Sequence, residues 1–177
     1  MTVHAQGATE TEFSFSFEND AGGWTAGFAD LPVGFDQSIY ELDSGYRQLP
    51  ECLDGGGVYV QGHNRRDDLF MFLKKRVEGL RADTTYVVSI SLDLATNVPA
   101  GSFGIGGSPG ESVYVKAEAS TAEPLIVEDN AAWLRMNIHK GNQATEGESM
   151  IVLGNVATPK WQAKSTGSRP WTTRIGP

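Results

Sequence analysis

Residues 11–20 read TEFSFSFEND, and the alternation in this stretch decides the fold class. Phe13, Phe15 and Phe17 alternate with serine or glutamate. Side chains of a β-strand point to opposite faces of the sheet in turn, so a period of two places one face in a core and the other in water. The stretch therefore predicts a half-buried β-strand.

Six further stretches are rich in β-branched or aromatic residues and are bounded by Gly, Pro, Asn or Asp, as strands are. They are residues 56–63, 68–77, 85–96, 111–119, 133–140 and 149–157. No window of 12 or more residues has helical apolar spacing, and the nearest, 69–80, fits the alternation of a strand better. Strands without helices to cover a parallel sheet predict an all-β protein, an antiparallel β-sandwich.

Composition and charge limit the partners. The chain has 177 residues, 40% hydrophobic and 20% charged, which is typical of one globular domain. Its net charge of −8 repels nucleic acid and anionic lipid, and no apolar stretch is long enough to cross a bilayer. Cys52 is the only cysteine, so no disulfide can form within the chain, and we expect it to be a small buried or half-buried hydrophobe.

The two ends differ from the predicted sandwich domain, residues 12–155. Residues 1–11 are expected to form a flexible N-terminus, and VHAQ at 3–6 is typical of the end of a signal peptide, which indicates a secreted or periplasmic protein. A frayed terminus without that meaning is the equal alternative. Residues 156–177 contain four basic residues and no acid, and they form either the last strand or a tail.

Two stretches carry a resemblance to a known fold. FSFENDAGGW, residues 15–24, resembles the opening strand of galactose-binding-like jelly rolls, which include many carbohydrate-binding modules. VEGLRADTTYVVSISLDL, residues 77–94, is similar to their central element. The resemblance implies a jelly roll but no particular ligand. Residues 95–119 resemble a segment of uncharacterised secreted bacterial proteins, whose typical ending is not found in 156–177.

The same resemblance implies a metal site. Jelly rolls of this type often hold a structural calcium ion near the first strand, which would fall on Glu18 and Asp20. The matching acid from the last strand is not identified. An ordinary turn, in which Asn19 and Asp20 bind their own backbone, is an equal alternative.

The glycine-rich stretch FGIGGSPGES, residues 103–112, is a candidate binding loop. A phosphate-binding loop needs a lysine after its last glycine, but Glu111 stands there, and Pro109 replaces the third glycine of a dinucleotide motif. The stretch therefore predicts a connection between strands, with Glu111 facing solvent. The glycines that can take positive φ in it are Gly104, Gly106, Gly107 and Gly110.

The candidate ligand-binding residues are aromatic side chains near loops, which can stack on pyranose rings, and polar residues of GHNRRDD at 62–68. They are Trp24, Tyr40, Tyr46, Tyr59, His63, Asn64 and Arg65. For the loop, a solvated hairpin tip whose charges offset one another is the favoured alternative.

These features predict a non-catalytic extracytoplasmic binding module for glycans, with a structural calcium. A small secreted enzyme and a structural or interaction domain without a small ligand are the alternatives. No catalytic residue is assigned, because the three histidines and the serines form no recognised constellation. Exposed aromatic rings would favour the binding module, and a deep pocket with two facing carboxylates would favour the enzyme.

Overall fold

A computed structural model describes most of the chain. The described residues are 1–5, 10–66, 68–148, 150–157 and 173–175. Most of the basic C-terminal segment, including Trp161 and Trp171, lies outside them. Residues 1–11, assigned from the sequence to a flexible N-terminus, include strand β1 (Thr2–Ala5) and the first two residues of β2 (Glu10–Glu12).

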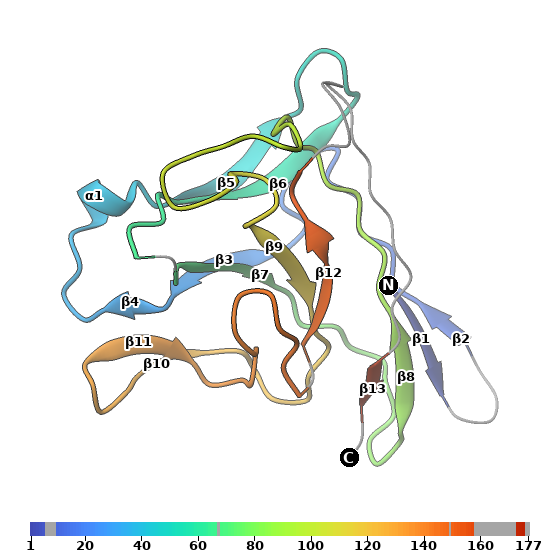
Figure 1. Cartoon of the computed structure of the whole chain (residues 1–177). Helices are drawn as coiled ribbons and strands as arrows, with labels where there is room; N and C mark the ends of the chain where they lie inside the picture. Colours follow the sequence, from blue (N-terminus) through green and yellow to red (C-terminus); the bar gives the residue numbers. More distant parts are fainter. Residues whose placement is uncertain (6–9, 67, 149, 158–172, 176–177) are drawn as a thin grey trace. The chain divides into compact units, whose positions relative to one another are not determined.

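The described residues form thirteen strands and one four-residue helix, and every strand pair is antiparallel (Figure 1). The predicted class, all-β with the antiparallel sheets of a sandwich, is confirmed; the jelly-roll order stays a prediction. No helix in the described part of the chain is long and apolar enough to span a membrane. The chain divides into two compact units: Met1–Ser14, Leu80–Thr121 and His139–Pro177 form unit 1, and Phe15–Gly79 and Ala122–Ile138 form unit 2.

Unit 1 contains a four-stranded sheet of order β13-β8-β1-β2 and the separate pair β9–β12. The strands besides β1 and β2 are β8 Tyr86–Ser89, β9 Tyr114–Ala117, β12 Ile151–Asn155 and β13 Thr173–Ile175. Tyr86 and Val88 alternate with less buried residues along β8 and are the buried centre of this unit. Phe13, Leu80 and Ile90 pack against them, so burial of apolar area holds the sheet.

Unit 2 contains three small sheets: β3–β7, β5–β6 and β10-β11-β4. Their elements are β3 Thr25–Ala29, β4 Leu31–Pro32, helix α1 Gln37–Tyr40, β5 Asp43–Gln48, β6 Gly56–Gln61, β7 Phe70–Lys74, β10 Ile126–Glu128 and β11 Trp133–Met136. Ala29 and Leu31 are fully or almost fully buried. Asp30 between them is also buried, and its Oδ1 accepts a hydrogen bond of 2.9 Å from Arg135 of β11.

In residues 11–20 the alternation of buried and exposed side chains is present, but the stretch does not pair as one strand. Phe13, Phe15 and Phe17 are half-buried, and the residues between them are exposed. The backbone of Phe13 exchanges two hydrogen bonds with Met1, of 2.7 and 2.8 Å, but only Glu10–Glu12 is assigned to a strand. The alternation thus predicted the burial of each side chain correctly. It was wrong in predicting one hydrogen-bonded strand over the whole stretch.

The other six predicted stretches each contain a strand, namely β6, β7, β8, β9, β11 and β12. Residues 70–74 form a strand, as their alternation indicated. One expectation is wrong: Cys52 lies exposed in the connection between β5 and β6. A turn follows Pro50, whose carbonyl accepts a 2.7 Å hydrogen bond from the N–H of Leu53, and this turn directs Cys52 outward.

Candidate functional site

The loop between β6 and β7, residues 62–68, is attached to the end of α1. Gly62 begins the loop at a point where a Cβ atom would lie 2.7 Å from Cδ2 of Leu69 and 3.0 Å from Cδ2 of Leu42, so a larger residue there would require these leucine side chains to shift. The N–H of His63 donates to the carbonyl of Tyr40 over 2.6 Å. These contacts hold the loop against the helix and thereby place the two arginines that follow.

Helix α1 is a single turn with a cap at each end. The Oδ1 atom of Asp36 accepts hydrogen bonds from the backbone N–H of Ser38 (2.9 Å) and from its hydroxyl (2.7 Å). Hydrogen bonding by the Ser38 hydroxyl, and then by its N–H, holds the pKa of Asp36 below its ordinary value. Glu41 ends the turn in the left-handed region, with φ of 49°. The caps fix the direction of the residues between them.

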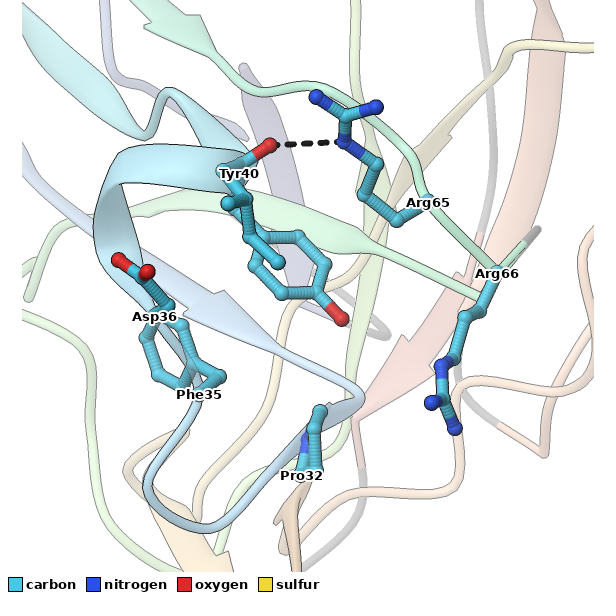
Figure 2. A pocket seen from close by; sticks show the side chains of 7 residues that line it. Pro32, Phe35, Asp36, Tyr40, Arg65 and Arg66 are labelled. Atoms are coloured by element: carbon cyan, nitrogen blue, oxygen red, sulfur yellow. Dashed lines mark hydrogen bonds between the residues drawn. The ribbon is translucent and has the colours of Figure 1, made fainter.

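An open pocket of about 370 Å³ lies between this turn, the loop and the end of β4 (Figure 2). Its walls combine apolar rings and chains with one carboxylate and two guanidinium groups. The lining residues are Pro32, Phe35, Asp36, Ile39, Tyr40, Arg65 and Arg66.

Tyr40 is the most buried residue of the pocket. Only 5% of it is exposed, and the ring of Phe35 packs against its ring edge-to-face at 5.6 Å between centroids. The Tyr40 hydroxyl makes no hydrogen bond within the described part of the chain. Figure 2 shows this hydroxyl directed into the space between Pro32 and Arg66. The ring is buried, whereas the hydroxyl oxygen is not among the buried unpaired atoms of the described residues and is open to water or a ligand in the pocket.

The two arginines differ in their contacts. The Nε atom of Arg65 donates a 2.8 Å hydrogen bond to the carbonyl of Ile39 (Figure 2). Its two terminal nitrogens remain available to donate to a ligand. Arg66 is exposed and has no hydrogen bond or ion pair among the described residues. Ile39 is 48% exposed beside them. The pocket thus joins donors for an anion to an apolar wall.

The structure brings together four of the predicted ligand residues. Tyr40 and Arg65 line the pocket, whereas His63 and Asn64 hold the loop behind it. The Oδ1 atom of Asn64 accepts a 3.4 Å hydrogen bond from the N–H of Leu69, and His63 lies 3.7 Å from the Glu41 carboxylate.

Trp24 lies elsewhere, in an aromatic cluster. Its ring meets Phe15 at 5.3 Å and Phe17 at 6.4 Å between centroids, both edge-on. The residue is half-buried, and its indole Nε1 is buried without a partner in the described residues. This ring packs against its neighbours instead of standing free to stack on a sugar.

Tyr46 and Tyr59 point to opposite faces of the β5–β6 pair. Tyr46 pairs with Val58 and Gly45 pairs with Tyr59, and adjacent residues of a strand face opposite sides. The Tyr46 hydroxyl donates to the carbonyl of Glu18 over 2.6 Å. The Tyr59 hydroxyl donates to Asp43 over 2.8 Å, and the Arg47 guanidinium covers its ring at 4.3 Å. The two rings therefore cannot share one ligand.

The predicted calcium ligands lie in a turn. The Oδ1 atom of Asp20 accepts a 2.6 Å hydrogen bond from the N–H of Gly22, as expected of the alternative in which this residue binds its own backbone. Glu18 is exposed. Among the described residues, no group of three or more His, Cys, Asp or Glu side chains converges as metal ligands would. Calcium at this turn stays a prediction.

The glycine-rich loop closes on itself. Gly104 and Gly107 exchange backbone hydrogen bonds of 2.9 and 3.3 Å, and the expected positive φ is found at Gly106 and Gly107. Gly104 and Gly110 do not have positive φ; Gly110 is buried, and a Cβ atom there would lie 2.8 Å from Ala157. The expectation for Glu111 is wrong, because its half-buried carboxylate accepts hydrogen bonds from Gly101 N–H (2.6 Å) and the Ser108 hydroxyl.

Sequence reasoning missed five lining residues of the pocket. Arg66 lies within GHNRRDD but has no predicted role, and no sequence pattern assigned a role to the other four, which are Pro32, Phe35, Asp36 and Ile39. One signal was available, since Asp36 followed two residues later by Ser38 is typical of a capped helical turn. Comparisons with family models, with curated proteins and with solved structures found no match.

Proposed function

We propose that this chain is a non-catalytic, extracytoplasmic binding module whose ligand is a glycan, bound in the pocket beside α1. One observation carries the proposal: Tyr40 is buried, yet its hydroxyl has no protein partner in the described residues and points into an open pocket. The hydroxyl oxygen is not among the buried unpaired polar atoms of the described residues, so it is open to the pocket and can exchange water for a ligand hydroxyl or charged group.

The lining suits a sugar ring. A pyranose has an apolar face and a rim of hydroxyls, and such ligands bind to mostly preformed surfaces with a few polar groups in place. Ile39, Phe35 and Pro32 offer apolar area. Tyr40 and the arginines offer hydrogen-bond donors, and the Asp36 oxygen that does not bind Ser38 can accept from hydroxyls.

The same lining favours binding over hydrolysis. Glycoside hydrolysis uses two carboxyl groups that flank the bond to be cleaved. Among the described residues that line this pocket, Asp36 is the single carboxylate, and one of its oxygens caps the helix.

A glycan array probed with the protein and two tyrosine variants tests the proposal. Tyr40→Phe keeps the ring and removes the unpaired hydroxyl, so we expect binding weakened by roughly tenfold, the effect of one hydrogen bond at about 1.4 kcal/mol. Tyr59→Phe is the control, because its hydroxyl is bound to Asp43. An array without a bound glycan, or equal losses in both variants, would contradict the proposal.

Two further parts of the proposal have separate tests. A secreted or periplasmic location rests on VHAQ at residues 3–6, and fractionation of cells that express the gene checks it.

A structural calcium at Glu18 and Asp20 would raise the melting temperature, since a ligand at 100 times its Kd adds about 2.7 kcal/mol to the free energy of unfolding. An unchanged melting temperature in EDTA, together with no calcium in the purified protein, would contradict the proposed calcium site.

A further inference from the structure

We propose that the pocket selects a saccharide that carries a carboxylate, such as a hexuronic acid, with the carboxylate at Arg65 and Arg66. The inference rests on the proposed function and names the class of sugar. It follows from the charges of the described lining residues: two guanidinium groups come from the loop, and one carboxylate comes from the start of α1.

Arg65 is held ready for an anion. Its Nε donates to the Ile39 carbonyl over 2.8 Å, which fixes the plane of the guanidinium group. The terminal nitrogens then form part of a rigid fork, and the planar fork of arginine matches the two oxygens of a carboxylate. An arginine fixed in this way loses less side-chain freedom when it binds its ligand.

Arg66 adds a second cation to the pocket, and it pairs with none of the residues that the structure describes. The chain as a whole carries eight more acidic than basic side chains. In a strongly acidic protein, a pair of adjacent arginines at a pocket supplies the local positive charge that an anionic ligand requires. Long-range repulsion by the remaining charge is screened at physiological salt beyond about 8 Å.

The Tyr40 hydroxyl completes the set of donors. It is a neutral donor from a ring that is 5% exposed and packed against Phe35, so its position is constrained. Hydrogen bonds to an ionised acceptor are roughly twice as strong as neutral ones. A carboxylate therefore suits this hydroxyl better than another hydroxyl does.

Asp36 sets the direction of the ligand. Figure 2 shows Asp36 and Arg66 on opposite sides of the Tyr40 ring. A negative charge at Asp36 repels a second anionic group on the ligand, while it accepts hydrogen bonds from sugar hydroxyls. The arrangement thus favours a sugar unit with one carboxylate over a polysulfated or phosphorylated chain.

Calorimetric titration with trigalacturonic acid and with its methyl ester tests the inference. The ester removes the charge and keeps the sugar rings, so we expect it to bind the wild-type protein at least about tenfold more weakly than the acid. Arg66→Ala should reduce that difference by weakening the binding of the acid and not that of the ester, while Arg65 remains. The control is Arg76→Ala, because Arg76 is an exposed arginine of the same unit that lies 3.7 Å from Glu78.

The outcomes separate this inference from the proposed function. Acid and ester binding equally, or an unchanged acid affinity in Arg66→Ala, overturns the carboxylate selectivity and leaves a glycan module. If neither binds while neutral glycans bind on the array, the selectivity is also overturned. If sodium acetate binds as tightly as trigalacturonic acid, the pocket is a simple anion site and the selectivity for a sugar is overturned. An array without any bound glycan would contradict the proposed function itself.

Discussion

Two loops of this protein attract attention in the sequence, and the structure uses them differently. The glycine-rich loop, residues 103–112, uses its polar groups internally: Glu111 binds Ser108 and the preceding Gly101, and Gly104 pairs with Gly107. The β6–β7 loop, residues 62–68, uses His63 and Asn64 to fix itself and leaves its arginines at a pocket.

The comparison shows which polar residues are available for a ligand. A side chain that closes its own loop contributes to stability, whereas one that the surrounding fold holds in place without a partner can bind something else. If this is right, substitutions in the first loop change stability and leave binding intact, and substitutions in the second do the reverse.

Gly110→Val should have the largest effect. Gly110 is buried, and a Cβ atom there would lie 2.8 Å from Ala157 and 3.2 Å from Val98. Overpacking at such a site costs about 1–3 kcal/mol, and we expect the upper end because part of the contact is with backbone. Urea unfolding measures this. Gly34→Ala is the control, since nothing lies within 4 Å and only its φ of 73° opposes a side chain.

Glu111→Gln should have the next largest effect. It weakens two charge-assisted hydrogen bonds that close the glycine-rich loop, and such bonds contribute about 1.5–3 kcal/mol each when intact. We expect a lower urea midpoint and unchanged glycan affinity. Glu78→Gln, at a side chain that is 82% exposed, should leave the midpoint unchanged. A Glu111→Gln variant as stable as the wild type would contradict the claim that the polar groups of the glycine-rich loop stabilise the fold.

Arg66→Ala should change stability by less than about 0.5 kcal/mol, because an exposed side chain without a partner in the described residues adds little. Its loss of affinity for an acidic sugar should appear at this unchanged stability. Thermal melting alongside calorimetry gives both values. A clear loss of stability would show that Arg66 belongs, like Glu111, to the closure of its own loop.

Asp36→Asn should have the smallest effect, a change in melting temperature that is seen only at acidic pH. Its pKa is lowered by hydrogen bonding to Ser38, so its contribution to stability is present above its ordinary pKa of 3.8 and is lost as the pH falls through the lower folded value. Asp36→Asn should flatten the melting temperature over that range. Asp54→Asn, which removes an exposed charge of the β5–β6 connection, should retain the wild-type profile.

Side-chain periodicity was the most reliable guide to the fold. It identified six strands and the burial of Phe13, Phe15 and Phe17. Strands with weak periodicity were missed: β3 contains Gly27 and two alanines, β5 is mostly polar, and β10 is exposed on both faces. Their positions depend on pairing with distant residues, for example Gly27 with Phe72, which local pattern does not reveal.

The candidate site was predicted only in part. Tyr40 and Arg65 were predicted as ligand residues, but their meeting depends on two hydrogen bonds from the loop to the helix, His63 N–H to the Tyr40 carbonyl and Arg65 Nε to the Ile39 carbonyl, which residue type does not indicate. Trp24, Tyr46 and Tyr59 were named for their aromatic character alone. Their rings or hydroxyls are used within the fold, and residue type does not indicate whether a partner is already present.

The exposed position of Cys52 has a consequence for the redox state of the protein. With no second cysteine in the chain, its thiol can form a disulfide only with another molecule. In a reducing compartment it remains a thiol, whereas outside the cytoplasm it is open to covalent dimerisation or to capture of a small thiol. Protein isolated from an oxidising compartment should therefore show a dimer band without reductant or a mass increase that reductant reverses, and the same thiol offers one unique position for a spectroscopic label.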